Sequence, residues 1–199
     1  MKGYITLDGE ISAIYLIYSK VKESREIFKY LHNKIRNNDS FWGHIAYLTK
    51  KDIIIDLDKL LSKKSQDHNL HSFLERFKKH GNFKALHFDR VKLDSFEKEL
   101  KNFSGFESSI NNLRNKIFAH TDRVTEEEIN HLDILDKKFD DLFMFIEDVL
   151  QTTSLLQGVQ LDFRGLFRSD EYSLHEMLEK ASSDRLSEFI AEANSIKRR

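Results

Sequence analysis

No proline interrupts the chain at any of its 199 positions, and only seven glycines occur along it. Tight hairpins and strand edges usually depend on these two residue types, so an all-β fold is poorly supplied with turns here. Helices need neither residue in their interior. The length suits one domain, with room for a small appendage. We therefore expect an all-α protein.

Apolar residues recur three and four positions apart, which is the spacing of one face of a helix. The clearest run predicts a long amphipathic helix over residues 11–37. A second helix is expected over 40–64, after Asp39 and Ser40, which suit a helix start. Its run Ile53–Ile55 could instead form a short strand, although its flanks favour a helix. The two predicted apolar stripes are Ile14, Ile17, Val21, Ser24, Phe28, Leu31 and Ile35, then Phe41, Ile45, Leu48, Ile55, Leu57 and Leu60.

The centre of the chain carries two patterns of the capping-box type, Ser104 with Glu107 and Thr125 with Glu128. They predict helices over 105–120 and 126–152, the latter with Leu132, Leu135, Phe139, Leu142, Ile146 and Val149 as its apolar stripe. Shorter helices are expected over 70–80, closed by Gly81, and over 94–102. We expect residues 1–153 to form a helical bundle. Residues 154–199 would be a C-terminal extension packed on it, with a strand-like stretch over 159–167 and two small helices.

Cysteine is absent, which excludes disulfides, thiolate metal sites and a cysteine nucleophile. The first 20 residues lack the basic and apolar pattern of a secretory leader, and no stretch approaches the roughly 20 apolar residues of a membrane span. We expect a cytoplasmic protein with no membrane partner. His68, His71 and Glu75 have helical spacing but lack a third ligand in register, so no metal site is predicted.

Charge is uneven although the net charge is only -1. Residues 59–92 hold nine Lys or Arg against three Asp or Glu, interleaved with Phe73, Phe77, Phe83 and Phe88. Residues 122–148 hold ten acids against three bases. The basic stretch suits a surface that faces RNA, but a solvated helix face over core phenylalanines explains it as well. Attraction to nucleic acid would have to be local.

The most distinctive segment is Leu113-Arg-Asn-Lys-Ile-Phe-Ala-His-Thr-Asp-Arg123. Arg114 is followed by a polar residue, Asn115, and five residues separate Arg114 from His120. This pattern resembles the catalytic signature of HEPN-domain ribonucleases, and the longer string R-N-K-x-x-A-H-x-D resembles the abortive-infection AbiU-like branch of that superfamily. Loose similarity extends over roughly residues 10–150.

The resemblance implies an up-and-down helical bundle that forms a homodimer and cleaves RNA without a metal or other cofactor. Such cleavage uses the ribose 2′-OH as nucleophile, and needs proton transfer and a cation on the phosphate. His120 would supply the first and Arg114 the second, with Asn115 beside them. The biological setting would be phage defence or a toxin–antitoxin pair, with an antitoxin protein as partner.

Six residues along a helix separate Arg114 and His120 by roughly 120° around the axis and about 9 Å along it. One helix alone does not bring these side chains together. A two-fold dimer would place both residues of both chains around one cleft. Asp122, Arg123 and Asn111 are supporting candidates, because they lie beside the motif in sequence or one helical turn away from it.

The same residues also fit ordinary structural roles. His120 lies on the apolar stripe of its predicted helix, so it could be a packed histidine, and Arg114 could be a surface cation. The alternative function is a non-catalytic helical module that binds RNA or protein and dimerises through the same motif.

Overall fold

The structure is a computed structural model that describes residues 6–34, 40–63, 68–119 and 136–163. Its α-helices are α1 (Leu7–Lys34), α2 (Ser40–Leu61), α3 (Leu70–Glu75), α4 (Arg90–Asn102), α5 (Ser104–Ala119) and α7 (Lys137–Ser154). Two short 3-10 helices are also present. The first, η2 (Lys84–Leu86), lies between α3 and α4, and the second, η3 (Leu155–Gln157), directly follows α7. No strand occurs in the described residues, so the all-α prediction is confirmed.

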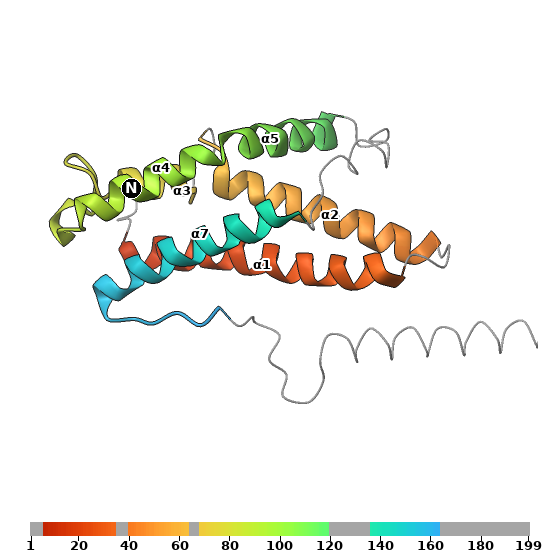
Figure 1. Cartoon of the computed structure of the whole chain (residues 1–199), viewed down its shortest axis with the longest axis horizontal. Coiled ribbons are helices and arrows are strands. Elements are labelled where there is room, and N and C mark those ends of the chain that lie inside the picture. The colour runs from red at the N-terminus through yellow and green to blue at the C-terminus, as the bar shows by residue number, and fades with distance from the viewer. Residues whose placement is uncertain (1–5, 35–39, 64–67, 120–135, 164–199) are drawn as a thin grey trace, which may run out of the picture. The chain divides into compact units, whose positions relative to one another are not determined.

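Helices α1 and α2 run antiparallel and pack along one another, with α5 against α2 and α7 against α1 (Figure 1). This arrangement confirms the predicted up-and-down bundle. Fully buried side chains from these helices form one continuous core. The core includes Ile14, Tyr18 and Val21 of α1, Ile53, Leu57 and Leu60 of α2, Ile110 of α5, and Phe139, Leu142 and Ile146 of α7.

The apolar stripes were predicted well for α1 and α7 and less well for α2. In α2, Leu48 is 41% exposed, whereas Ala46, Ile53 and Ile54 are buried. The run Ile53–Ile55 lies inside the helix and not in a strand. Apolar residues fill more than one face of α2, so their spacing alone did not identify the face that packs against α1.

Two predicted helix starts were wrong, because in each case an Asp side chain accepts a hydrogen bond from a backbone N–H of the first turn. Where a helix was expected over 126–152, α7 begins at Lys137, because the Asp136 carboxylate caps it by accepting from the Lys138 N–H. The helix expected over 94–102 begins earlier, because Asp89 accepts from the Val91 N–H. The residues from 126 to 135 lie outside the described part of the chain.

The helix expected over 70–80 is also shorter than predicted, since α3 ends at Glu75. The Arg76 carbonyl accepts from the Phe83 N–H at 2.8 Å, which closes residues 76–83 into a compact turn. A side-chain Cβ on Gly81 would overlap the Arg76 backbone. Gly81 therefore permits this close approach.

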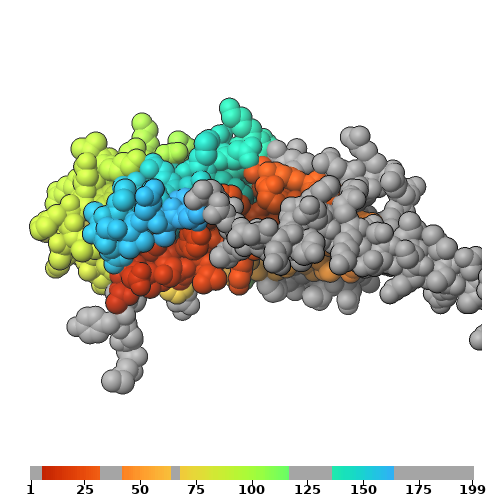
Figure 2. Space-filling view, turned by 90° about the horizontal axis from the view of Figure 1, so that it is seen from below, coloured from red at the N-terminus to blue at the C-terminus, as the bar shows by residue number. Residues whose placement is uncertain are grey.

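After α7 the chain lies against the start of α1, where Figure 2 shows blue residues beside red ones. The Tyr15 hydroxyl donates to the Asp162 carbonyl at 2.7 Å, and the Lys22 ammonium donates to the Phe163 carbonyl at 2.7 Å. Residues 159–163 form no strand, unlike the expectation for 159–167. By its internal contacts the chain separates into Met1–Arg164 and Gly165–Arg199, and the second unit lies outside the described residues. The division at residue 153 stays a prediction.

No helix in the described segments has the length and hydropathy needed to cross a membrane.

Candidate active site

Helix α5 carries the first part of the sequence motif. Arg114 has a side chain that is 42% exposed, and Asn115 beside it is exposed. The helix ends at Ala119, directly before His120. His120, Asp122 and Arg123 lie outside the described residues, so their predicted roles stay predictions.

Four side chains of α5 and α2 form a closed ring of polar contacts. Arg114 Nη1 donates to Asn115 Oδ1 at 3.1 Å, and Asn115 Nδ2 donates to Asn111 Oδ1 at 3.1 Å. Asn111 Nδ2 then donates to Asp58 Oδ1 at 3.1 Å. Arg114 Nε lies 3.5 Å from Asp58 Oδ2 and completes the ring. The structure thus brings together Arg114, Asn115 and the supporting candidate Asn111.

Asp58 is the ring member that sequence reasoning missed. Its side chain is only 12% exposed, and it lies between the buried Leu57 and the exposed Lys59 on α2. A mostly buried carboxylate normally needs a cation or donors, which Arg114 and Asn111 provide. A single acid beside core leucines was the available signal, but its partners lie more than 50 residues further along the chain.

A surface hollow of about 290 Å³ adjoins the ring at Asn111. Its other lining residues are Ser62, Lys63, Glu107, Ser108 and Asn112. The Glu107 carboxylate contacts the Lys63 N–H at 3.4 Å and His71 Nε2 at 3.2 Å. Glu107 therefore joins α5 to α3 and to the end of α2, instead of bonding back to its own helix start as the capping-box pattern predicted. The second capping box, Thr125 with Glu128, lies outside the described residues.

The histidines considered for a metal site have separate partners. His71 contacts Glu107, whereas His68 Nδ1 lies 3.1 Å from Glu10 Oε1, near the start of α1. Among the described residues, no group of three or more acids and histidines is arranged to hold a metal ion.

The ring holds Arg114 in a position from which it can contact a phosphate group. The guanidinium of Arg114 is held from two sides by Asp58 and Asn115, yet a large part of the side chain is open to solvent. A planar guanidinium in a fixed orientation is suited to contact phosphate oxygens. The ring therefore holds a cation in a fixed orientation six positions before His120 in the sequence.

The all-helical bundle is consistent with the result of the comparison with protein families. The family model described as AbiU2, HEPN_AbiU2, matches residues 6–162. The chain belongs to the AbiU2 family of HEPN proteins. This match confirms the resemblance to the AbiU-like branch and covers all described residues except Phe163. Neither a curated protein nor a solved structure matches the chain significantly.

Proposed function

We propose that this AbiU2-family protein is a metal-independent endoribonuclease that acts in phage defence or as the toxin of a toxin–antitoxin pair. The observation that carries the proposal is the oriented Arg114 guanidinium at the end of α5, in a chain of the HEPN family. Family membership supports a role of the abortive-infection or ribonuclease type. The motif residues supply the chemistry that such a role needs.

In the proposed reaction, the ribose 2′ oxygen attacks the adjacent phosphorus and the bond from phosphorus to the 5′ oxygen breaks. The 2′-OH proton goes to a base, and a proton is supplied to the leaving 5′ oxygen. The products are a 2′,3′-cyclic phosphate and a 5′-hydroxyl. Arg114 contacts the phosphate while charge develops on its oxygens, and His120 transfers protons.

The proposed enzyme is a homodimer, because a helix that continued from Arg114 to His120 would set the two side chains roughly 120° apart around its axis. Two copies related by a two-fold axis would contribute both residues to one cleft. An antitoxin protein is the proposed partner that keeps such an activity in check. Measurement of the molar mass in solution tests the dimer directly, and a monomer that cleaves RNA would contradict it.

The decisive test is incubation of the purified chain with cellular RNA in EDTA, followed by analysis of the fragment ends. We expect 2′,3′-cyclic phosphate ends from the wild type. His120→Ala and Arg114→Ala should reduce cleavage by at least about a hundredfold, the range of a lost acid–base group. His44→Ala and Lys20→Ala are matched controls, since both residues are exposed on other helices.

If the folded wild type does not cleave any RNA tested, or if both motif variants cleave as well as it does, the enzymatic proposal is wrong. Retained RNA or protein binding without cleavage would then favour the non-catalytic helical module.

A further inference from the structure

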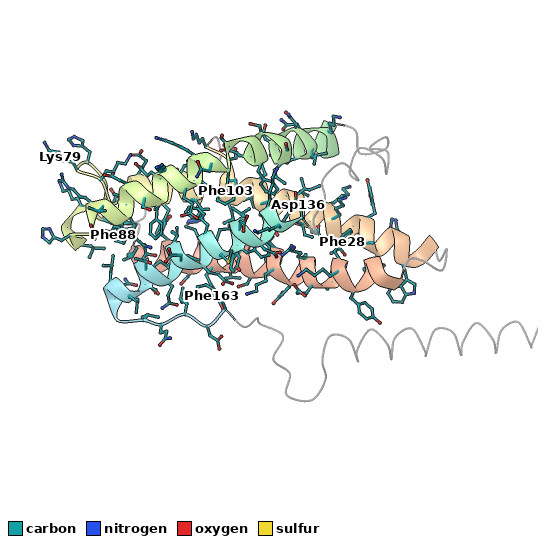
Figure 3. All side chains as sticks on the ribbon, viewed as in Figure 1. Phe28, Lys79, Phe88, Phe103, Asp136 and Phe163 are labelled. Atoms are coloured by element: carbon teal, nitrogen blue, oxygen red, sulfur yellow. The ribbon has the colours of Figure 1, made fainter. Side chains whose placement is uncertain are left out.

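A second hollow lies at the far end of the bundle from the motif, between residues 77–88 and the start of α4. Its volume is about 410 Å³, and its walls include Lys79, Lys84, His87, Phe88 and Arg90. Figure 3 labels Lys79 and Phe88 at this end of the described helices. The proposed reaction does not use these residues.

The hollow has an excess of positive charge. Lys79, Lys84 and Arg90 are exposed, and none of them forms an ion pair with an acid in the described residues. Asp94 is the one acid among the lining residues. Lys78 also lines the hollow, but its ammonium is held by Glu75 at 2.7 Å and by Glu97 at 2.5 Å. Three cations therefore remain to attract an anion.

Aromatic rings form part of the same wall. Phe88 is half-buried, and its ring centroid lies 5.0 Å from that of Phe77 and 6.3 Å from that of Phe96. This packing holds Phe88 in place while part of the residue borders the hollow. Cations next to an aromatic platform are the combination with which proteins bind single-stranded nucleic acid.

The segment that carries these side chains is held in shape by its backbone. The hydrogen bond from the Phe83 N–H to the Arg76 carbonyl fixes the turn between Lys79 and Lys84. His87 adopts a left-handed conformation, with φ of 47°, and redirects the chain toward α4. A fixed arrangement of cations loses less conformational entropy when it binds a ligand than a mobile one does.

We propose that this hollow binds the backbone of single-stranded RNA, with a base against Phe88, as a contact separate from the Arg114 motif. As a substrate contact, the inference rests on the proposed ribonuclease function. Helices α4 and α5 follow one another along one side of the bundle, separated by Phe103 (Figure 1). At 1.5 Å per residue, Arg90 and Arg114 lie about 35 Å apart along them. At the roughly 3.4 Å per nucleotide of a strand stacked as in a duplex, this distance corresponds to about ten nucleotides, and to fewer when the strand is extended.

The test uses fluorescent uridine oligonucleotides with 2′-O-methyl groups, which lack the 2′-OH nucleophile. Binding is thereby measured without cleavage, so a failure of the ribonuclease proposal does not affect the result. The variant Lys79→Glu, Lys84→Glu, Arg90→Glu should bind a 20-nucleotide oligonucleotide at least about tenfold more weakly than the wild type. Its slope of log affinity against log salt should be shallower by about 2, because each phosphate contact on a single strand contributes about 0.7.

The matched control is Lys20→Glu, Lys98→Glu, Lys138→Glu, which changes the net charge equally at exposed positions outside the hollow. This control should bind the oligonucleotide much as the wild type does. Phe88→Leu should weaken binding without changing the salt slope, because it removes the aromatic platform and no charge. Circular dichroism establishes that each variant is folded.

Several results would overturn the proposal. Equal weakening in the two triple variants would mean that net charge, and not the hollow, attracts RNA. Loss of binding to vesicles of anionic lipid, with RNA binding unchanged, would identify a membrane-facing surface. Unchanged affinity of the hollow variant for the 20-nucleotide oligonucleotide would exclude a contact at the hollow.

Discussion

Asp58 on α2 gives the Arg114 side chain a fixed partner. The carboxylate approaches Nε of the guanidinium and also accepts from Asn111, so it orients two members of the ring at once. Because it is mostly buried, Asp58 acts on a ligand through Arg114 and not by direct contact. It is therefore a positioning residue in the proposed reaction.

Asp58→Asn should lower kcat/KM for RNA cleavage about tenfold, which corresponds to about 1.4 kcal/mol of transition-state stabilisation. The substitution keeps the size of the side chain and removes the charge that aligns Arg114. In an Arg114→Ala background it should have almost no further effect, because interacting residues give non-additive changes. Asp56→Asn is the matched control, since Asp56 pairs with Lys59 on the same helix.

Single-turnover cleavage of one RNA substrate by the four proteins of this cycle gives the comparison. A tenfold loss that persists in the Arg114→Ala background would show that Asp58 acts independently of the guanidinium, and would remove its positioning role.

At the scale of elements, the positions of the helices could be predicted from the sequence, whereas the residues at which they begin and end often could not. Periodicity identified α1 and α7 because one face of each is buried continuously along the described residues. Ends at Asp89, Glu75 and Asp136 depend on individual hydrogen bonds to carboxylates or carbonyls, which apolar spacing does not encode. Glu107 had the sequence of a cap but formed a contact between helices instead.

Gly81 is the residue on which the turn between α3 and α4 depends most directly. We expect Gly81→Ala to lower the free energy of unfolding by about 1–3 kcal/mol, because the new methyl group would overlap the Arg76 backbone. Gly43→Ala is a control with the opposite sign. It lies within α2 with nothing within 4 Å of the added Cβ, so it should stabilise the protein by up to about 1 kcal/mol.

Urea unfolding of the two variants and the wild type measures both changes. A Gly81→Ala protein as stable as the wild type, with unchanged RNA affinity, would show that the turn tolerates rearrangement and that its shape does not fix the cations.

At the scale of the whole molecule, the sequence predicted the bundle and the α5 part of the site, but not how α2 completes it. Arg114, Asn115 and Asn111 share one helix, so their proximity follows from helical geometry alone. Asp58 joins them only through the packing of α5 against α2, a tertiary contact that no spacing within one helix contains. Family membership and helices can be predicted from the sequence, whereas such a contact between helices cannot.

The bundle is also joined by a charged pair between its first and last described helices. Arg25 of α1 has a side chain only 3% exposed, which lies over Phe139 and Phe143 and donates to Asp140 of α7 at 2.5 Å. The hydrogen bond from Arg25 lowers the pKa of Asp140 below its ordinary value of 3.8. The buried cation thus stabilises the folded protein through an exposed carboxylate.

This pair predicts a loss of stability in acid. Because the folded-state pKa of Asp140 is depressed, its contribution is present above pH 3.8 and disappears as the pH falls through the lower folded-state pKa. Asp140→Asn should remove at most about 1 kcal/mol at pH 6, since the carboxylate is largely exposed, and progressively less as the pH falls below 3.8. The free energies of unfolding of the wild type, of Asp140→Asn and of the control Asp141→Asn are measured between pH 6 and pH 2. A stability difference between the wild type and Asp140→Asn that grows toward low pH would contradict the assignment.

The acid in the α5 ring has a consequence for which anions the motif selects. Small anions that reach Arg114 find a guanidinium whose charge is already paired with Asp58, so they bind there only weakly. A polymer that is tethered elsewhere on the protein arrives at high local concentration and can compete with the carboxylate. The motif would then bind long RNA chains and not the free phosphates of the cell.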